Sequence, residues 1–320
     1  MSESQPKFNY GGQAVMEGVM MRGSSHMAMA VREPSGGIFL YEEPLTSFFY
    51  TNKIARWPFV RGVTVLWDAL VLGTRALMKS ANVALEEEGE ELSPWMIAVT
   101  LLLSLGLAVV IFFVTPVLLS GLVDAFVASS LVSVIIEGVI RLAFFLVYLL
   151  LIGLLPDIRR VFAYHGAEHK TINAYEDGAP LEVDAVSRYS TAHPRCGTGF
   201  LLVVLMVSIL VFGFLGRPDW LWRIGSRILL IPVVASISYE IVRWGAAHRG
   251  NRLVRPLMAP TLALQSLTTR EPEPAQLEVG ITALKHVLVA EGLASVDILT
   301  TEPSPGQAER RAASKLGTPA

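Results

Sequence analysis

The sequence predicts a mainly α-helical membrane protein. We expect a four-helix transmembrane bundle made of two hairpins, a small N-terminal α+β cytoplasmic module, and a cytoplasmic helical insert between spans 2 and 3. Three observations predict this class. The chain is 52% hydrophobic and only 17% charged, whereas a soluble domain carries about a quarter charged residues. Four apolar segments are long enough to cross a hydrocarbon core of about 30 Å. Lys and Arg gather on one side of these segments.

The composition also excludes other classes. A net charge of −2 argues against a nucleic-acid-binding protein, which needs an excess of basic surface. A single cysteine, Cys196, excludes an internal disulfide framework. Residues 1–25 lack an apolar run, so we expect no cleaved signal peptide and insertion through internal spans.

Residues 1–60 are expected to form the N-terminal module. Segments 27–31 and 38–41 flank a Pro/Gly turn and predict a β-hairpin. The Gly-rich stretch before them carries three polar side chains in an apolar run, Gln13, Glu17 and Arg22. We interpret these as substrate contacts on an arm that covers a site; ordinary surface positions on a tight turn are the alternative.

Residues 61–95 are expected to connect this module to the membrane. An apolar face runs from about residue 58 to 85 and predicts an amphipathic helix lying along the membrane interface. The acidic run 86–91 that follows is interpreted as a solvated linker.

The four predicted spans are 96–123, 131–155, 199–216 and 224–244, which form the hairpins 96–155 and 199–244. Loop 124–130 has no Lys or Arg, whereas loop 156–198 has five. Both termini and the central loop are therefore expected in the cytoplasm. Arg217, Arg223 and Arg227 are exceptions on the other side. Within the spans we expect two mutually neutralising pairs, Glu137–Arg141 and Glu240–Arg243.

The C-terminal part is expected to return to the cytoplasmic module. Segment 245–301 includes a short helix over 276–289, predicted from helical apolar spacing. The tail 302–320 is rich in Pro, Ser, Ala and charge and is predicted to be disordered.

The strongest chemical signal is a His-x-x-Glu-His motif in segment 156–198. A helix is predicted from Pro156 to Gly178, so His165 and His169 lie on one face and can share a metal ion. Glu168 is then the candidate general base. The motif has the residue order of inverted zinc peptidases.

A third ligand is expected from residues 193–199, which end where the third span begins. His193 and Cys196 both suit a borderline-soft ion such as zinc, and Arg195 between them is a candidate substrate contact. Glu176 lies about 10.5 Å beyond His169 along the helix axis and is excluded as a ligand. Glu240 and His248 are expected at the same membrane face.

Four motifs together resemble the YqhQ-like family of uncharacterised bacterial membrane proteins. They are Gly11-Gly12-Gln13-Ala14-Val15-Met16-Glu17-Gly18-Val19-Met20-Met21-Arg22-Gly23, Tyr164-His165-Gly166-Ala167-Glu168-His169-Lys170, His193-Pro194-Arg195-Cys196-Gly197-Thr198 and Leu267-Thr268-Thr269-Arg270-Glu271-Pro272. The resemblance covers roughly residues 8–290. It implies a multi-pass protein of the bacterial inner membrane and a metal-dependent enzyme of unknown substrate.

These observations lead to one hypothesis and three alternatives. The hypothesis is a zinc-dependent hydrolase embedded in the membrane and facing the cytoplasm, with the lipid bilayer and an unknown substrate or protein as partners. A non-catalytic scaffold or assembly factor is the main alternative. A cysteine hydrolase that uses Cys196 with a histidine base, and a small transporter, are the other two.

Overall fold

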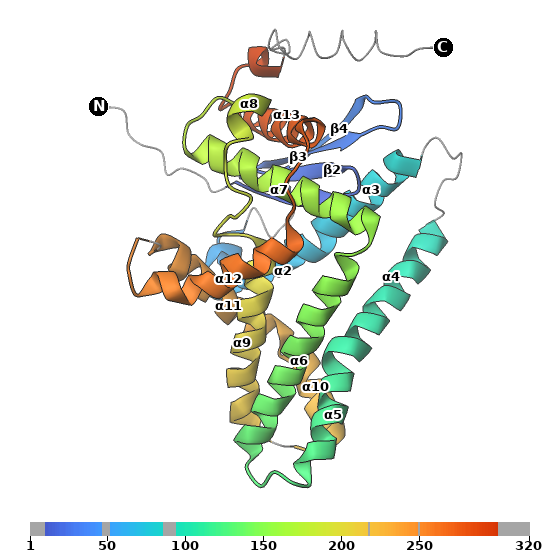
Figure 1. The fold of residues 1–320 in the computed structure, drawn as a ribbon, viewed down its shortest axis with the longest axis vertical. Helices are drawn as coiled ribbons and strands as arrows, with labels where there is room; N and C mark the ends of the chain where they lie inside the picture. The colour runs from blue at the N-terminus through green and yellow to red at the C-terminus, as the bar shows by residue number, and fades with distance from the viewer. Residues whose placement is uncertain (1–9, 47–51, 86–93, 217, 249, 300–320) are drawn as a thin grey trace.

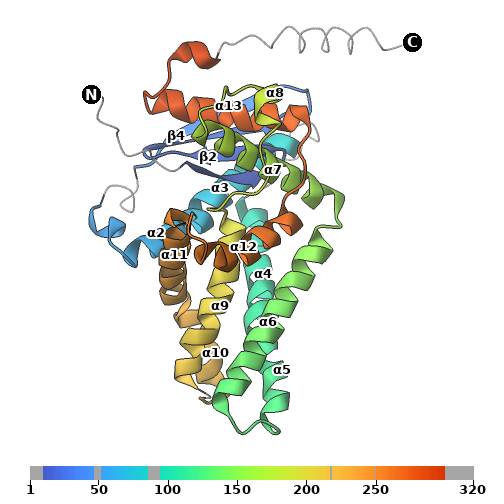
Figure 2. The same cartoon turned by 60° about the vertical axis from the view of Figure 1, so that its left-hand side comes forward.

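The computed structural model describes residues 10–46, 52–85, 94–216, 218–248 and 250–299. It is mainly helical, with one small sheet near the N-terminus. A layered unit of sheet and helices stands on a group of long apolar helices (Figures 1 and 2). The acidic run 86–91 and the tail 302–320 lie outside the described residues.

The sheet has four antiparallel strands in the order β1-β2-β3-β4. Their bounds are β1 Gly11–Val15, β2 Gly18–Arg22, β3 His26–Arg32 and β4 Ile38–Pro44. The predicted hairpin is confirmed as β3 and β4. The Gly-rich arm before it is a second hairpin, in which Gly12 pairs with Met21 and Glu17 takes a left-handed φ of 50° in the turn.

Two apolar cores form on the two faces of this sheet. On one face, Val19, Met21 and Ala28 pack against helices α7 (Pro156–Glu176) and α13 (Pro274–Ala290). On the other, Val15 and Met20 pack against helix α3 (Gly73–Leu85). The alternation of the strands separates the two sets. The sheet therefore shares its cores with helices from the middle and the end of the chain.

Glu291, just after α13, ties the first described residues to the last helix. Its carboxylate accepts hydrogen bonds from Tyr10 Oη, Ser24 Oγ and Ser25 N at 2.9, 2.9 and 2.7 Å. Burial alone would raise the pKa of Glu291, but these hydrogen bonds outweigh burial and lower it. The contact spans 281 residues of sequence.

Helices α7 and α13 confirm two further predictions. Pro156 opens α7 in its first turn, and Gly178, at φ 78°, follows its end. A capping box between Glu273 and Gln276 opens α13. The short helix α8 (Val183–Val186) and the loop after it lead back from α7 toward the apolar helices.

The helix expected over residues 58–85 is present as an unbroken helical run from Val60 to Leu85, with a π-helical turn in its middle. A 3₁₀ turn, Ile54–Arg56, precedes α2 (Val60–Trp67), and a π-helical turn, Asp68–Leu72, separates α2 from α3. The two halves have different neighbours, because α2 packs on α11 (Ile231–Ala247) and α3 on the sheet. The helix itself is therefore confirmed, and its position along a membrane interface stays a prediction.

Within the part of the chain that the structure describes, three helices are long and apolar enough to cross a membrane. They are Trp95–Asp124, made of α4 (Pro94–Val109), the π turn Val110–Val114 and α5 (Thr115–Asp124); α6 (Ser130–Ile152); and α9 (Gly197–Leu215). A fourth candidate is the pair α10 (Trp220–Leu229) and α11, bent by 47° at Leu230. Pro232 follows the bend, and proline lacks the N–H that a continuous helix requires. After α11 the chain runs through α12 (Val254–Thr268), α13 and a final 3₁₀ turn, Val296–Leu299.

The charged residues in these helices pair differently from the prediction. Glu137 does contact Arg141, at 2.8 Å, but it also binds Arg223 and Arg227. Arg223 and Arg227 are thus buried among helices, not displayed on the far side; Arg217 is outside the described residues.

Glu240 makes its close ion pair with Arg61 of α2, whereas Arg243, the partner we expected, acts on it only as a more distant charge. Since α2 crosses α11, it brings Arg61 within reach of Glu240. Gly62 permits this crossing, because a Cβ there would lie 2.5 Å from the Cα of Ser236.

We therefore predict that Gly62→Ala lowers the stability of the protein by about 1–3 kcal/mol, the usual cost of overpacking. Thermal unfolding in detergent measures this change. Gly225→Ala is the matched control, because a Cβ at Gly225 meets nothing within 4 Å. Equal midpoints for the two variants would contradict the tight α2–α11 crossing.

Candidate metal centre

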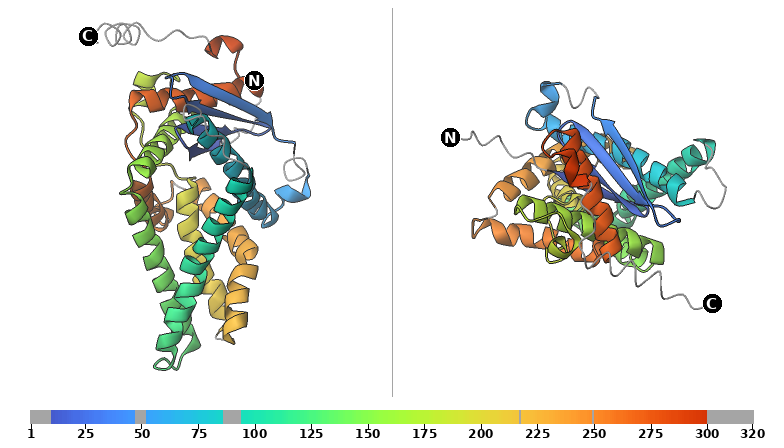
Figure 3. Two further views of the ribbon diagram at one scale, coloured as in Figure 1. Left: turned by 90° about the vertical axis from the view of Figure 1, so that its right-hand side faces the viewer. Right: turned by 90° about the horizontal axis from the view of Figure 1, so that it is seen from above.

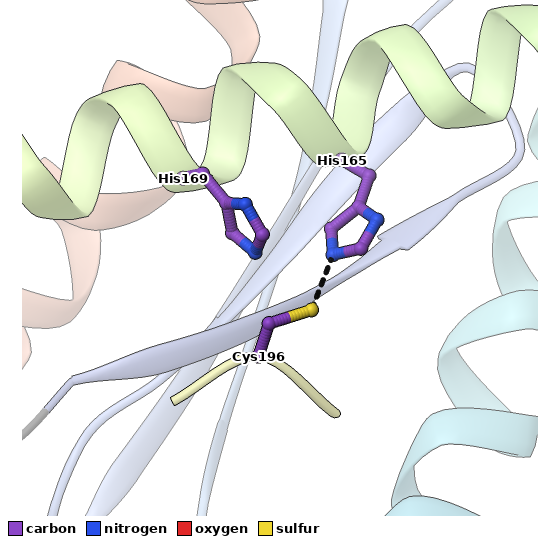
Figure 4. Close-up of side chains that lie close together, drawn as sticks. All are labelled: His165, His169 and Cys196. Carbon is purple, nitrogen blue, oxygen red and sulfur yellow. Dashed lines mark hydrogen bonds between the residues drawn. The ribbon is translucent and has the colours of Figure 1, made fainter. Parts of the chain in front are cut away.

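The candidate centre lies where the layered unit meets the apolar helices. Helix α7 supplies His165 and His169 from successive turns, as the i, i+4 spacing predicts. The loop before α9 supplies Cys196, which is the N-cap of that helix and accepts a hydrogen bond from Thr198 N at 3.4 Å. Figure 4 shows the two rings and the thiol pointing toward one another.

The ligand-type atoms of these three side chains converge. One atom from each of His165, His169 and Cys196 lies within 4.8 Å of the other two, and Cys196 Sγ is 3.3 Å from His165 Nε2. A tetrahedral zinc ion separates a sulfur and a nitrogen ligand by about 3.5 Å, given its usual bond lengths. The donor set and its spacing therefore fit a zinc-type ion.

Both imidazoles are oriented by main-chain carbonyls. His165 Nδ1 lies 2.9 Å from Thr268 O at the end of α12, and His169 Nδ1 lies 2.5 Å from Thr191 O. A carbonyl oxygen only accepts, so each Nδ1 carries a proton, and Nε2 is the ring nitrogen that can offer a lone pair to the cluster. This is the tautomer that a metal-binding histidine needs.

Glu168 lies between the histidines and the sheet. Its carboxylate Oε2 is 3.8 Å from His165 Nε2 and 3.7 Å from His169 Nε2, and the residue is 5% exposed. Strand β1 approaches it closely at Gly12, where a Cβ would lie 2.8 Å from Glu168 Cγ. A larger residue at position 12 would displace the glutamate.

His193, the other predicted third ligand, is not part of the three-residue cluster. Its ring centroid is 5.6 Å from that of His169, and its buried Nε2 has no hydrogen-bond partner among the described residues. The nearest carboxylate oxygen is Glu176 Oε2 at 3.9 Å, which is ion-pair distance only. Between the two alternatives, the geometry favours Cys196.

The loop that carries Cys196 is held at two points. The side chain of Gln265 on α12 makes two hydrogen bonds to the main chain of His193. Its Oε1 accepts from His193 N at 2.9 Å, and its Nε2 donates to His193 O at 2.8 Å. Arg195 forms an ion pair with Glu176 at the end of α7. The His193 imidazole and the Arg195 guanidinium, against the opposing effect of burial, lower the pKa of Glu176 to about 2. Glu176 is thus a loop anchor.

The polar residues predicted on the N-terminal arm are dispersed. Glu17 accepts two hydrogen bonds from Arg160 and one from Tyr164 Oη, at 2.7, 2.5 and 3.2 Å. Gln13 packs against Gly73 of α3, on the sheet face away from α7. Arg22 belongs to the same face by strand alternation. Of the arm, Gly12 makes the close contact with Glu168.

The other histidines lie elsewhere. His248 is exposed at the end of α11, where Nδ1 contacts Trp244 O at 2.9 Å, so it does not join the predicted gathering. His26 contacts Ser25, and His286 pairs with Glu42.

Four positions that organise the centre were not predicted from the sequence: Gly12, Thr191, Gln265 and Thr268. Thr191 and Thr268 act through their main-chain carbonyls. Every residue has such a group, so the residue type at these positions could not reveal their role. Gly12 and Thr268 do fall in the quoted motifs, a hint that these segments meet. Gln265 had no signal.

Comparison with known proteins places the chain in a family. Residues 57–290 match a family of proteins of unknown function, DUF1385. The chain belongs to this family. It is also 35% identical over 307 residues to the uncharacterized protein YqhQ of Bacillus subtilis strain 168, covering 92% of this chain and 96% of that protein. No solved structure matches it. The resemblance noted above is confirmed, and the DUF1385 match includes the histidine motif and the cysteine loop.

The Glu176 anchor predicts a pH dependence of stability. Its folded pKa of about 2 lies below the ordinary 4.5, so its contribution is full above about pH 4.5 and is lost as the pH falls toward 2. Glu176→Gln should therefore lower stability at pH 7 by about 1–2 kcal/mol, allowing for partial exposure. The deficit should shrink below pH 4.5.

Thermal unfolding of wild type and variant between pH 7 and pH 3 measures this deficit. Asp184→Asn, at an exposed position on α8, is the control. A deficit that stays constant across the range would show that Glu176 acts by packing and not by charge.

Proposed function

We propose that this protein is a zinc-dependent hydrolase of the bacterial inner membrane, with its active centre at the cytoplasmic face. The observation that carries the proposal is the convergence of two imidazole rings and one thiol, from separate segments, beside a buried carboxylate. Three protein ligands leave a fourth position for water or substrate, as in catalytic zinc sites.

The roles follow from position. His165, His169 and Cys196 would hold the ion. A bound zinc ion supplies Lewis acidity and lowers the pKa of a coordinated water to about 7. Glu168, with its carboxylate less than 4 Å from both Nε2 atoms, is placed to accept a proton from water at the centre and to pass it to a leaving group. Burial excludes bulk water and strengthens these interactions.

The orientation follows from the charge distribution. Within the described residues, Arg159, Arg188 and Arg195 lie at the end that carries the centre, and Arg223 and Arg227 are neutralised inside the helices. Because these two arginines pair with carboxylates inside the helices, we do not count them as basic residues of the non-cytoplasmic side. Without them, the excess of basic residues at the end that carries the centre is larger, which favours placing that end in the cytoplasm. We therefore infer a four-span arrangement, with the bent pair as the fourth span and both termini cytoplasmic.

The first test is metal content. Purified wild type should contain about one zinc ion per chain, and His165→Ala with His169→Ala should retain at most about a tenth of that. Elemental analysis of protein exchanged into metal-free detergent buffer measures both. His248→Ala, a histidine outside the cluster, should keep the wild-type content. A wild type without stoichiometric metal would contradict the proposal and favour the non-catalytic scaffold.

Cobalt substitution tests the third ligand. Cobalt-loaded wild type should show thiolate-to-cobalt charge-transfer absorption in the near ultraviolet, and Cys196→Ser should lose it. His193→Ala should retain the band, because His193 lies outside the cluster. A cobalt-loaded wild type without the band, or a Cys196→Ser variant that keeps it, would remove Cys196 from the ligand set.

Glu168→Gln tests the general base. The variant should bind zinc as wild type does and lose about 10²–10⁴-fold in turnover. The rate can be followed with fluorogenic amide, ester and phosphodiester substrates presented in vesicles. Equal rates for both proteins on a hydrolysed substrate would remove Glu168 from the mechanism.

One contact favours a second candidate, a cysteine hydrolase. Cys196 Sγ lies 3.3 Å from His165 Nε2, within reach for a thiol–imidazole pair. Alkylation separates the two functions. If Cys196 is a zinc ligand, bound zinc should slow its alkylation by iodoacetamide, and a chelator should restore the rate. If Cys196 is a nucleophile, it should react with iodoacetamide at the same rate with or without zinc.

A further inference from the structure

The apolar helices hold a second cluster of ionisable residues, far from the candidate metal centre. It comprises Asp124 at the end of α5, Glu137 and Arg141 on α6, and Arg223 and Arg227 on α10. Figures 1 and 3 show α5 and α10 at the end of the helices opposite to α7. We call these five residues the intramembrane charge cluster.

Glu137 is the centre of this cluster. Its carboxylate, 1% exposed, contacts Arg141 at 2.8 Å, Arg223 at 3.0 Å and Arg227 at 3.0 Å. Arg223 also binds Asp124 at 2.7 Å. Charges in hydrocarbon are costly, and such residues persist where they are paired or serve a function.

The intramembrane charge cluster has one more positive than negative group. Among the described members of the cluster, three guanidinium groups face two carboxylates, and the three arginines are at most 4% exposed. Asp219, next to α10, is exposed and does not fill the deficit inside. An uncompensated buried charge costs several kcal/mol, so an anion is the missing element.

A pocket opens at the edge of the cluster, beside the Arg223–Asp124 ion pair. It has a volume of about 260 Å³, with apolar walls from Val117, Leu118 and Ile224, and with Asp124 and Arg223 in its lining. Arg223 Nη1 donates to Asp124, which places that nitrogen at the pocket. The volume lies below the usual range of about 300–1,000 Å³ for whole small-molecule sites, so it fits a headgroup or a similar fragment.

We propose that this pocket binds the phosphate of an anionic phospholipid, with Arg223 as its donor and the lipid chain along the apolar walls. The surroundings favour a lipid over a free anion. Trp220 lines the pocket and is 64% exposed, and Trp222 is 60% exposed. Tryptophan collects at the headgroup level of membranes. A lipid there supplies the missing negative charge and holds the bent α10–α11 pair against α5. This site is independent of the proposed hydrolase.

Gly121 offers a way to fill the pocket without touching the charges. It lines the pocket, and a Cβ there meets nothing within 4 Å. Gly106 is the matched control, in the same apolar helix Trp95–Asp124, equally open, and not a lining residue. Gly121→Leu and Gly106→Leu can therefore be compared directly.

The first experiment is native mass spectrometry of the full chain, purified in mild detergent and incubated with phosphatidylglycerol. Wild type and Gly106→Leu should retain about one such lipid per chain, and Gly121→Leu should retain at least about fivefold less. Equal retention by all three, or equal loss in both variants, would overturn the proposal.

The second experiment identifies the source of the anion. Added phosphatidylglycerol should raise the thermal midpoint of wild type by several degrees, since a ligand of the native state stabilises it. Phosphatidylcholine and inorganic phosphate should raise it by less than half as much. An equal shift with phosphatidylcholine would exclude recognition of net charge. An equal shift with inorganic phosphate would make this a free-anion site.

Discussion

The candidate centre depends on two hydrogen bonds that imidazoles make to the main chain. The carbonyls of Thr268 and Thr191 fix the protonated nitrogen of His165 and His169. Without them, rotation about χ2 or a change of tautomer would turn a proton toward the cluster. The bonds come from α12 and from the loop before α9, so the arrangement needs the apolar helices and the layered unit to be docked at the right distance.

Close backbone approach makes this docking possible. At Gly166, a Cβ would lie 2.1 Å from the carbonyl oxygen of Arg270, and Arg270 N donates to Phe162 O at 2.9 Å. The segment after α12 thus lies directly on α7, between the two histidine-bearing turns and the start of α13. Lys170 Nζ adds a contact to Ser187 O at 2.7 Å.

Sequence reasoning predicted those parts of the protein that depend on local rules. The helix from Pro156, the β3–β4 hairpin, the apolar helices and the pairing of His165 with His169 follow from periodicity, turn residues and capping. The helix–helix contacts that re-paired Glu240 with Arg61 could not be predicted, because they depend on which helices become neighbours. The same applies to Gln265, whose clamp on His193 spans 72 residues. The arm does reach the centre at Gly12, but strand alternation turns Gln13 to the other face of the sheet.

The bond between Tyr10 and Glu291 has a consequence for how the protein is made. One face of the N-terminal sheet is completed by α13, which the ribosome delivers after the apolar helices have been synthesised. At about 5–20 residues per second, the 281 residues between the two partners correspond to roughly 15 to 55 seconds. During that time Met21 and Ala28 lack part of their final cover. The strands can pair with one another early, but this face of the sheet is fully covered only after the last helix has been made and has docked on it.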